Sequence, residues 1–129
     1  MKPNPIVRYL DKTEALECPY GNVSRIVTGG EGGISNVHVV KVTQGTAHSH
    51  PGYDEVFYIL SGTGSICLNN TTYAVRPGTV AVIPRGTEHS IVSDTEKPIE
   101  FIIFGTPPMA MNDDRATPLK KDNNENAST

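Results

Sequence analysis

The chain is a succession of short strand-like segments separated by turn residues, and this rhythm constrains its fold more than any other feature. Segments rich in valine and isoleucine, such as residues 34–43 and 56–60, are each followed by a turn containing glycine. The 129 residues include 12 Gly and 10 Pro, which supply these turns. β-Branched and aromatic runs bounded by turns at intervals of about eight to twelve residues are typical of an all-β barrel or sandwich.

The strand-like segments also divide the chain into three parts. The expected strands cover residues 23–28, 34–43, 56–60, 65–68, 71–75, 79–83, 89–93 and 98–104. Asn69 and Asn70 are expected to form a two-residue hairpin turn, because asparagine tolerates the left-handed backbone conformation. We therefore expect an N-terminal arm over residues 1–22, a β-domain over residues 23–106, and a polar tail over residues 107–129. The end of this tail has almost no apolar side chains to bury, so we expect it to be mobile.

Composition excludes several classes of function. Eleven basic and 14 acidic residues give a net charge of −3, whereas a nucleic-acid-binding protein normally carries a basic face. No run approaches 18 apolar residues, so no membrane span is expected. The first residues, Met1 to Ile6, include two prolines and no apolar core of a signal peptide. We therefore expect a cytoplasmic protein whose two cysteines, Cys18 and Cys67, remain reduced.

Three of the four histidines and one acidic residue form a pattern typical of a metal site. His48 and His50 are two positions apart, and residues i and i+2 of a strand point to the same face. Glu55 follows after a short Pro-Gly break, and His89 begins a later expected strand. Three imidazoles and one carboxylate suit one divalent transition metal, such as iron, manganese, nickel, cobalt or zinc. An octahedral ion would keep two open positions. The alternative is that these histidines are ordinary polar residues near a loop.

The spacing around these residues resembles a known family. The first run is His48-x-His50-x4-Glu55-x6-Gly62, and the second is Gly78-x5-Pro84-x-Gly86-x2-His89. Both runs are similar to the two signature motifs of the cupin superfamily, and the resemblance covers roughly residues 37–104. It implies a double-stranded β-helix, or jelly-roll, barrel with a metal inside one mouth.

The resemblance also implies a ligand set. The residues at the cupin metal-binding positions are His48, His50, Glu55 and His89. Two positions depart from the family pattern: Val42 stands where cupins have the leading glycine of the first motif, and Ser93 stands where an asparagine is usual. Neither position is a ligand in cupins, so these departures concern loop geometry only.

Strand parity suggests further residues of a binding pocket. Phe57 and Ile59 share parity with Glu55, so we expect both to face the barrel interior, where they line the pocket or fill the core. Tyr58 has the opposite parity and is expected outside, under another sheet or a partner subunit. Tyr53 lies in the loop between the expected metal ligands and is a third candidate for the pocket wall.

Other residues leave alternatives open. His38 is read as a surface or hydrogen-bonded histidine, with a fifth ligand or a proton relay as the alternative. Parity alone does not decide whether Phe101 and Ile103 face inwards. Cys67 is expected to be a small buried residue rather than a reactive thiol.

These observations favour an enzyme that acts on a small oxygen-rich molecule. The metal would act as a Lewis acid or bind dioxygen, so we place an oxygenase first. The alternatives are an isomerase, a lyase or a decarboxylase for a sugar or organic acid, a small-ligand-binding cupin without turnover, and an accessory subunit. No second catalytic acid or base is identifiable. Because small cupins commonly dimerise, often by exchanging N-terminal strands, the resemblance also implies a homodimer.

Overall fold

The structure, a computed structural model, describes residues 4–18, 21–108 and 117–118. Within these residues the chain is almost entirely β, and its only helices are two short 3-10 turns, η1 (Leu10–Lys12) and η2 (Gly29–Glu31). No helix in the described part of the chain is long and apolar enough to cross a membrane. The strands are β1 (Ala15–Cys18), β2 (Gly21–Val27), β3 (Asn36–Val42), β4 (His48–Ser49), β5 (Asp54–Ser61), β6 (Gly64–Leu68), β7 (Thr71–Val75), β8 (Val80–Ile83), β9 (His89–Ser93), β10 (Ile99–Thr106) and β11 (Thr117–Pro118).

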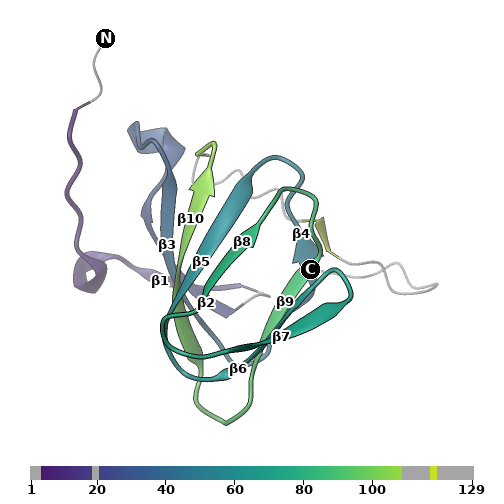
Figure 1. The fold of residues 1–129 in the computed structure, drawn as a ribbon. Coiled ribbons are helices and arrows are strands. Elements are labelled where there is room, and N and C mark those ends of the chain that lie inside the picture. Colours follow the sequence, from purple (N-terminus) through teal and green to yellow (C-terminus); the bar gives the residue numbers. More distant parts are fainter. Residues whose placement is uncertain (1–3, 19–20, 109–116, 119–129) are drawn as a thin grey trace.

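The strands form two sheets that face each other across the core (Figure 1). The larger sheet has the order β1-β2-β3-β10-β5-β8, and the smaller has the order β11-β4-β9-β6-β7. All pairings are antiparallel, and neighbouring strands are often distant in the sequence, as when β10 pairs with both β3 and β5. This arrangement is the jelly-roll fold expected from the sequence, an all-β double-stranded β-helix.

The alternation of side chains along each strand explains the core. In β5, Phe57 and Ile59 are 3% and 2% exposed, whereas Tyr58 between them is 41% exposed. In β10, Phe101 is 2% exposed and faces the same interior, which settles the parity that the sequence leaves open. The buried apolar residues of the core are Val23, Val40, Val42, Phe57, Ile59, Ile66, Val75, Ile83, Ile91, Ile99 and Phe101.

The turns follow the expected chemistry. The hairpin between β6 and β7 pairs Leu68 with Thr71, and Asn69 takes a positive φ of 55°, as a tight two-residue turn requires. Gly62 has a φ of 93°, and a Cβ there would lie 2.8 Å from the Cα of Ile99. Both backbone conformation and space therefore require glycine at this position.

The two ends of the chain add to the sheets. β1 lies in the segment expected as an N-terminal arm, and it pairs with β2 at the edge of the larger sheet. Residues 4–14 run along the outside, away from the two sheets (Figure 1). Most of the expected mobile tail lies outside the described residues. Its residues 117–118 form β11, which pairs with β4.

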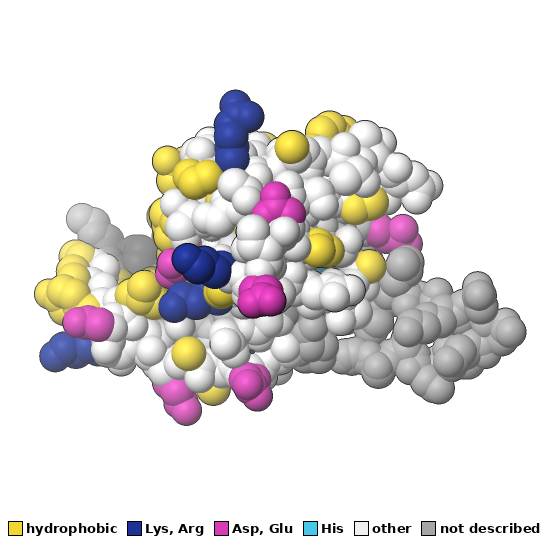
Figure 2. All heavy atoms as spheres, turned by 90° about the horizontal axis from the view of Figure 1, so that it is seen from below, with side chains coloured by type: hydrophobic (Ala, Val, Ile, Leu, Met, Phe, Trp, Pro, Cys, Tyr) yellow, Lys and Arg dark blue, Asp and Glu magenta, His cyan; other side chains and the backbone are white. Residues whose placement is uncertain are grey.

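Charged side chains of both signs are mixed on the surface. On the face seen from below, Lys and Arg side chains lie among Asp and Glu side chains instead of gathering in one area (Figure 2). That face therefore lacks the basic surface with which proteins contact nucleic-acid backbones.

Candidate metal centre

Three histidines from the smaller sheet meet inside one mouth of the fold. His48 begins β4 and pairs in register with His89, the first residue of β9, while His50 directly follows β4. The ring centroid of His48 lies 4.3 Å from that of His89 and 4.8 Å from that of His50. One ligand atom from each residue can be chosen so that all three lie within 4.8 Å of one another. The motif spacing thus brings together histidines that are up to 41 residues apart.

Backbone carbonyls orient two of these rings. The Nδ1 of His48 donates a hydrogen bond to the carbonyl of Thr46 at 2.8 Å, and the Nδ1 of His89 donates one to the carbonyl of Thr87 at 2.9 Å. Because a carbonyl only accepts, Nδ1 must carry the proton, and in the neutral ring Nε2 then has the lone pair. The Nε2 of His89 is buried and has no hydrogen-bond partner among the described residues. Both rings are therefore held in the tautomer that binds a metal through Nε2.

Tyr53 orients the third ring. Its hydroxyl lies 2.7 Å from the Nδ1 of His50, and the two rings stack with their centroids 4.5 Å apart. A hydroxyl can accept the Nδ1 proton, which leaves the lone pair of His50 on Nε2 as well. Tyr53 itself is only 4% exposed, so this contact is shielded from water.

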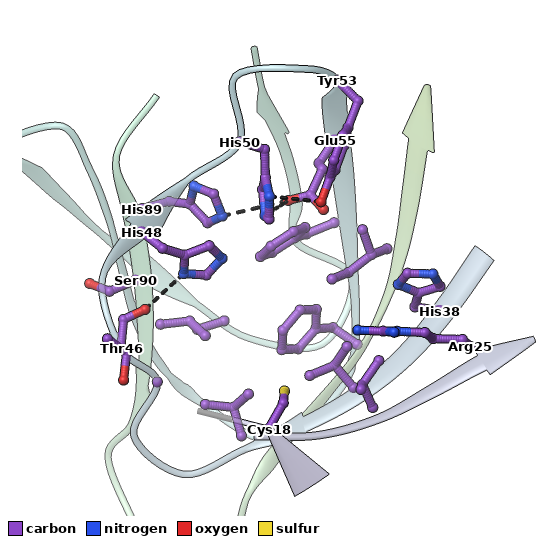
Figure 3. Close-up of a pocket in the computed structure, with 18 residues that line it drawn as sticks. Cys18, Arg25, His38, Thr46, His48, His50, Tyr53, Glu55, His89 and Ser90 are labelled. Atoms are coloured by element: carbon purple, nitrogen blue, oxygen red, sulfur yellow. Dashed lines mark hydrogen bonds and ion pairs between the residues drawn. The ribbon is translucent and has the colours of Figure 1, made fainter. Parts of the chain in front are cut away.

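Glu55 reaches the histidines from the opposite sheet. It lies near the start of β5 and is 5% exposed, and its Oε1 is 3.5 Å from the Nε2 atoms of both His50 and His89 (Figure 3). Ligands about 2.1 Å from a shared ion lie roughly 3.0 to 3.4 Å apart when adjacent. The two Glu55 distances are close to these values, and the three histidine donors lie within 4.8 Å of one another. Three imidazoles and one carboxylate at this spacing fit one divalent transition metal.

Burial keeps the histidines neutral. Desolvation, followed by the nearby His48, His89 and His38, lowers the pKa of His50 from 6.5 to about 3. Desolvation and His48 lower the pKa of His89 to about 4, against the opposing hydrogen bond to the Thr87 carbonyl. A neutral imidazole is the form that binds a metal.

The loop before His89 is fastened to the loop that carries His50. Arg85 forms a two-atom contact with Asp54, from Nε to Oδ1 and from Nη2 to Oδ2, each at 3.1 Å, and its backbone N–H also donates to Asp54. The N–H of Gly86 donates to the carbonyl of His50 at 2.9 Å. The pKa of Asp54 is lowered by its hydrogen bonds to Arg85. These bonds connect Glu55, the neighbour of Asp54, to the segment that positions His89.

A cavity opens beside the histidines. It is lined by Tyr53 and Phe57, two of the three residues proposed for the pocket wall, while Ile59 lies in the core and outside the lining. Phe57 also contacts the cluster, with its ring centroid 5.9 Å from that of His89.

Sequence reasoning missed Arg25 as a residue of this cavity, and for His38 it offered a role near the metal only as an alternative. Arg25 and His38 both line it, and His38 is 7% exposed rather than at the surface. Parity was only a partial signal: Arg25 and His38 are each two residues from a buried valine, Val23 and Val40, and so share a strand face with it.

The two cysteines form no disulfide. Cys67 is half-buried and its thiol donates to the carbonyl of Asn69 at 3.3 Å, whereas Cys18 lines the cavity at its far end from Tyr53 (Figure 3).

Known proteins share this sequence pattern and fold. An uncharacterized protein of Methanocaldococcus jannaschii is 32% identical over 66 residues, which is 51% of this chain and 53% of that protein. The chain thus aligns with about half the length of this curated relative.

Two solved structures show the same fold at low identity. A crystal structure of a protein from Planctomyces limnophilus has a TM-score of 0.78 at 24% identity, covering 88% of this chain and 96% of that one. Ectoine synthase from P. lautus has a TM-score of 0.73 at 18% identity, covering 96% of both chains.

The sequence profile of the Cupin domain matches residues 36–105, which is more than half of the chain and includes both motifs. The chain therefore belongs to the cupin family.

Proposed function

We propose that this chain is a mononuclear metal enzyme that acts on a small oxygen-rich molecule. His48, His50, Glu55 and His89 would hold one divalent transition metal, which would supply a Lewis acid with open positions for substrate or dioxygen. The observation that carries the proposal is the convergence of three buried imidazoles, whose Nδ1 atoms are bonded to oxygen atoms outside the cluster. The Glu55 carboxylate lies 3.5 Å from two of these rings.

The remaining residues shape the site around that ion. Tyr53 and the carbonyls of Thr46 and Thr87 hold the histidine rings in place, so the rings need to move little when the metal ion binds. Phe57 forms an apolar wall beside His89, which limits the access of water to that side of the cluster.

Calorimetric titration of metal into chelator-treated protein tests the metal site. We expect one Fe²⁺, Mn²⁺, Ni²⁺, Co²⁺ or Zn²⁺ to bind per chain, and we expect His89→Gln to lower the affinity by more than about 100-fold, beyond the loss typical of an outer-shell residue. His38→Gln is the matched control, since it removes a cavity histidine outside the cluster. Wild-type protein that binds none of these ions would refute the proposal.

An oxygenase is the first candidate reaction, as the sequence predicts, because open metal positions could bind dioxygen. A non-oxidative reaction is the second, and the name of the structural relative ectoine synthase, which does not denote an oxygenase, favours it. Oxygen uptake by the iron-loaded protein with a panel of catechols, diketones and thiols distinguishes them. Uptake that depends on both iron and substrate supports the oxygenase, and product formation without oxygen supports an isomerase, lyase or decarboxylase. Recovery of every bound compound unchanged would support a binding protein without turnover.

We also propose that the protein is a cytoplasmic homodimer. The two unpaired thiols suit a reducing compartment. The outer face of the larger sheet exposes apolar side chains that a second copy would cover.

A further inference from the structure

The cavity beside the histidine cluster carries a fixed positive charge on the opposite wall. Arg25 projects from β2 into the cavity, and His38 lies next to it, whereas His48 and His89 occupy the other side (Figure 3). An arginine stays protonated at any pH at which the protein is folded. The Nε of Arg25 is buried, so at least part of this charge lies inside the protein.

The strand register explains this placement. Arg25 pairs with His38, His38 with Ile103, and Ile103 with Phe57, so these four residues form one row across the larger sheet. Three strand spacings of about 4.8 Å separate the backbones of Arg25 and Phe57. The side chain of Arg25 extends over part of that span, towards the centre of the cavity (Figure 3).

The wall between the two polar ends is apolar. Ile103, Phe57 and Phe101 line it, and the rings of Phe57 and Phe101 lie 4.7 Å apart. Among the described residues that line the cavity, the only carboxylate is Glu55, which lies beside His50 and His89. The chain thus places a cation and a candidate metal centre at two sides of one apolar space.

The size of the cavity limits the ligand. A cavity needs roughly 10–15 Å³ to hold one water molecule, and the volume here is about 70 Å³, which leaves room for a small molecule only. Both polar ends belong to one cavity, because Arg25, His38 and the three histidines of the cluster all line it. A ligand that contacts both ends is therefore a small molecule of few atoms.

We propose that Arg25, assisted by His38, binds the carboxylate of a small organic acid whose other end faces the histidine cluster. This inference rests on the proposed function and names its substrate class. A guanidinium matches a carboxylate through two parallel hydrogen bonds, and such charge-assisted bonds are strong where water is excluded. A short apolar body between the two ends would pack on Phe57 and Phe101. Arg25 is a specificity-determining residue in this account.

Direct binding measurements test the carboxylate site without any turnover. The probes are 3-methylbutanoate, its uncharged amide and inorganic phosphate, titrated calorimetrically into the metal-free full-length protein. We expect the carboxylate to bind at least 10-fold more tightly than both the amide and phosphate. Arg25→Gln should abolish this preference, Arg25→Lys should retain part of it, and the exposed Arg76→Gln should leave it unchanged.

Equal binding of acid and amide, tighter binding of phosphate, or an unaltered preference in Arg25→Gln would overturn the inference. Thermal unfolding establishes whether each variant is folded. If Arg25→Gln does not fold, the binding of acid and amide to wild type and to Arg25→Lys still tests whether Arg25 binds the carboxylate. His48→Ala with His50→Ala separates this inference from the proposed metal site. A double variant that loses metal binding but keeps the preference for the acid supports Arg25 as the anchor. Wild-type protein that prefers the acid but binds no metal would refute the proposed function alone.

Discussion

At the scale of single residues, the site depends on histidines that are buried in their neutral form. The pKa of His50 is about 3 and that of His89 is about 4, both below the ordinary value of 6.5, chiefly because burial penalises the charged ring. An unfolded chain would instead take up protons at these residues near pH 6.5. Protons therefore bind the unfolded chain more readily than the folded one, which makes the stability of the protein depend on pH.

The first prediction is that metal-free protein loses stability between about pH 6.5 and pH 4. Because the folded pKa values are lowered, the unfolded state binds more protons in this window, and the free energy of unfolding falls as pH falls. Each histidine contributes at most about 1.4 kcal/mol per pH unit. Urea unfolding in the presence of chelator at pH 7.5, 6 and 5 measures the slope. His89→Gln should give a shallower slope, and an unchanged slope in that variant would contradict the prediction.

The second prediction concerns Tyr53. Removing its hydroxyl in Tyr53→Phe leaves the ring free to stack on His50 but deletes the 2.7 Å contact with Nδ1. We expect the metal affinity to fall about 10-fold, as is typical when an outer partner of a histidine ligand is lost. Tyr73→Phe, on the exposed surface of β7, is the matched control and should bind metal normally. Equal affinity in Tyr53→Phe and wild type would show that the hydroxyl does not orient His50.

The sequence identified the histidines of the cluster because His48 and His50 are two residues apart, and because His89 ends a second motif with a recognisable spacing. Arg25 was not identified as a cavity residue and His38 was left open, although the parity of both matches that of buried valines. A polar residue in a strand is more often exposed than buried, so alternation alone does not place it inside. The cross-strand row that brings Arg25 opposite the cluster depends on pairings between distant segments, which no single segment encodes.

At the scale of elements, the strands from β5 to β10 were predicted closely, whereas β1 and β4 were not predicted as strands. The expected strand over residues 71–75 coincides with β7, and that over residues 89–93 coincides with β9. β4 has two residues and β1 has four, too few to show alternation. β1 and β4 form because the neighbouring strands β2 and β9 supply their hydrogen bonds. Such pairing depends on the tertiary fold more than on the local sequence.

The third prediction compares two turns of the fold. Gly62 and Gly78 both have a positive φ, of 93° and 90° respectively. A Cβ at Gly62 would meet the backbone of Ile99 at 2.8 Å, whereas at Gly78 nothing lies within 4 Å. Gly78→Ala should therefore cost about 1 kcal/mol, from backbone strain alone, and Gly62→Ala should cost clearly more. Chemical unfolding of both variants measures the difference, and equal losses would be inconsistent with the close approach to Ile99.

At the scale of the whole molecule, an apolar surface is open on the outside of the larger sheet. Val80 and Val82 are 58% and 64% exposed on β8, and Val80 pairs with Tyr58 of β5. Tyr58 itself is 41% exposed, so these apolar side chains lie next to one another on two paired strands. Contiguous apolar side chains at a surface commonly mark a protein–protein interface.

The fourth prediction is that light scattering gives a mass of about twice 13.9 kDa, that of a symmetric dimer. Val80→Asp combined with Val82→Asp should convert the protein into a monomer, because two carboxylates would be desolvated in the interface. Thr72→Asp, which adds a charge on the exposed surface of β7, is the control and should remain dimeric. A monomeric wild-type protein would exclude this assembly.

The central claim is that the four converging side chains hold one metal ion, and elemental analysis tests it most directly. Protein purified without added metal should contain about one iron, manganese, nickel, cobalt or zinc ion per chain. His48→Ala with His50→Ala should remove it, while the fold, monitored by circular dichroism, remains intact. An unchanged metal content in the folded double variant, or a wild-type protein that contains no such ion and binds none when they are supplied, would contradict the account.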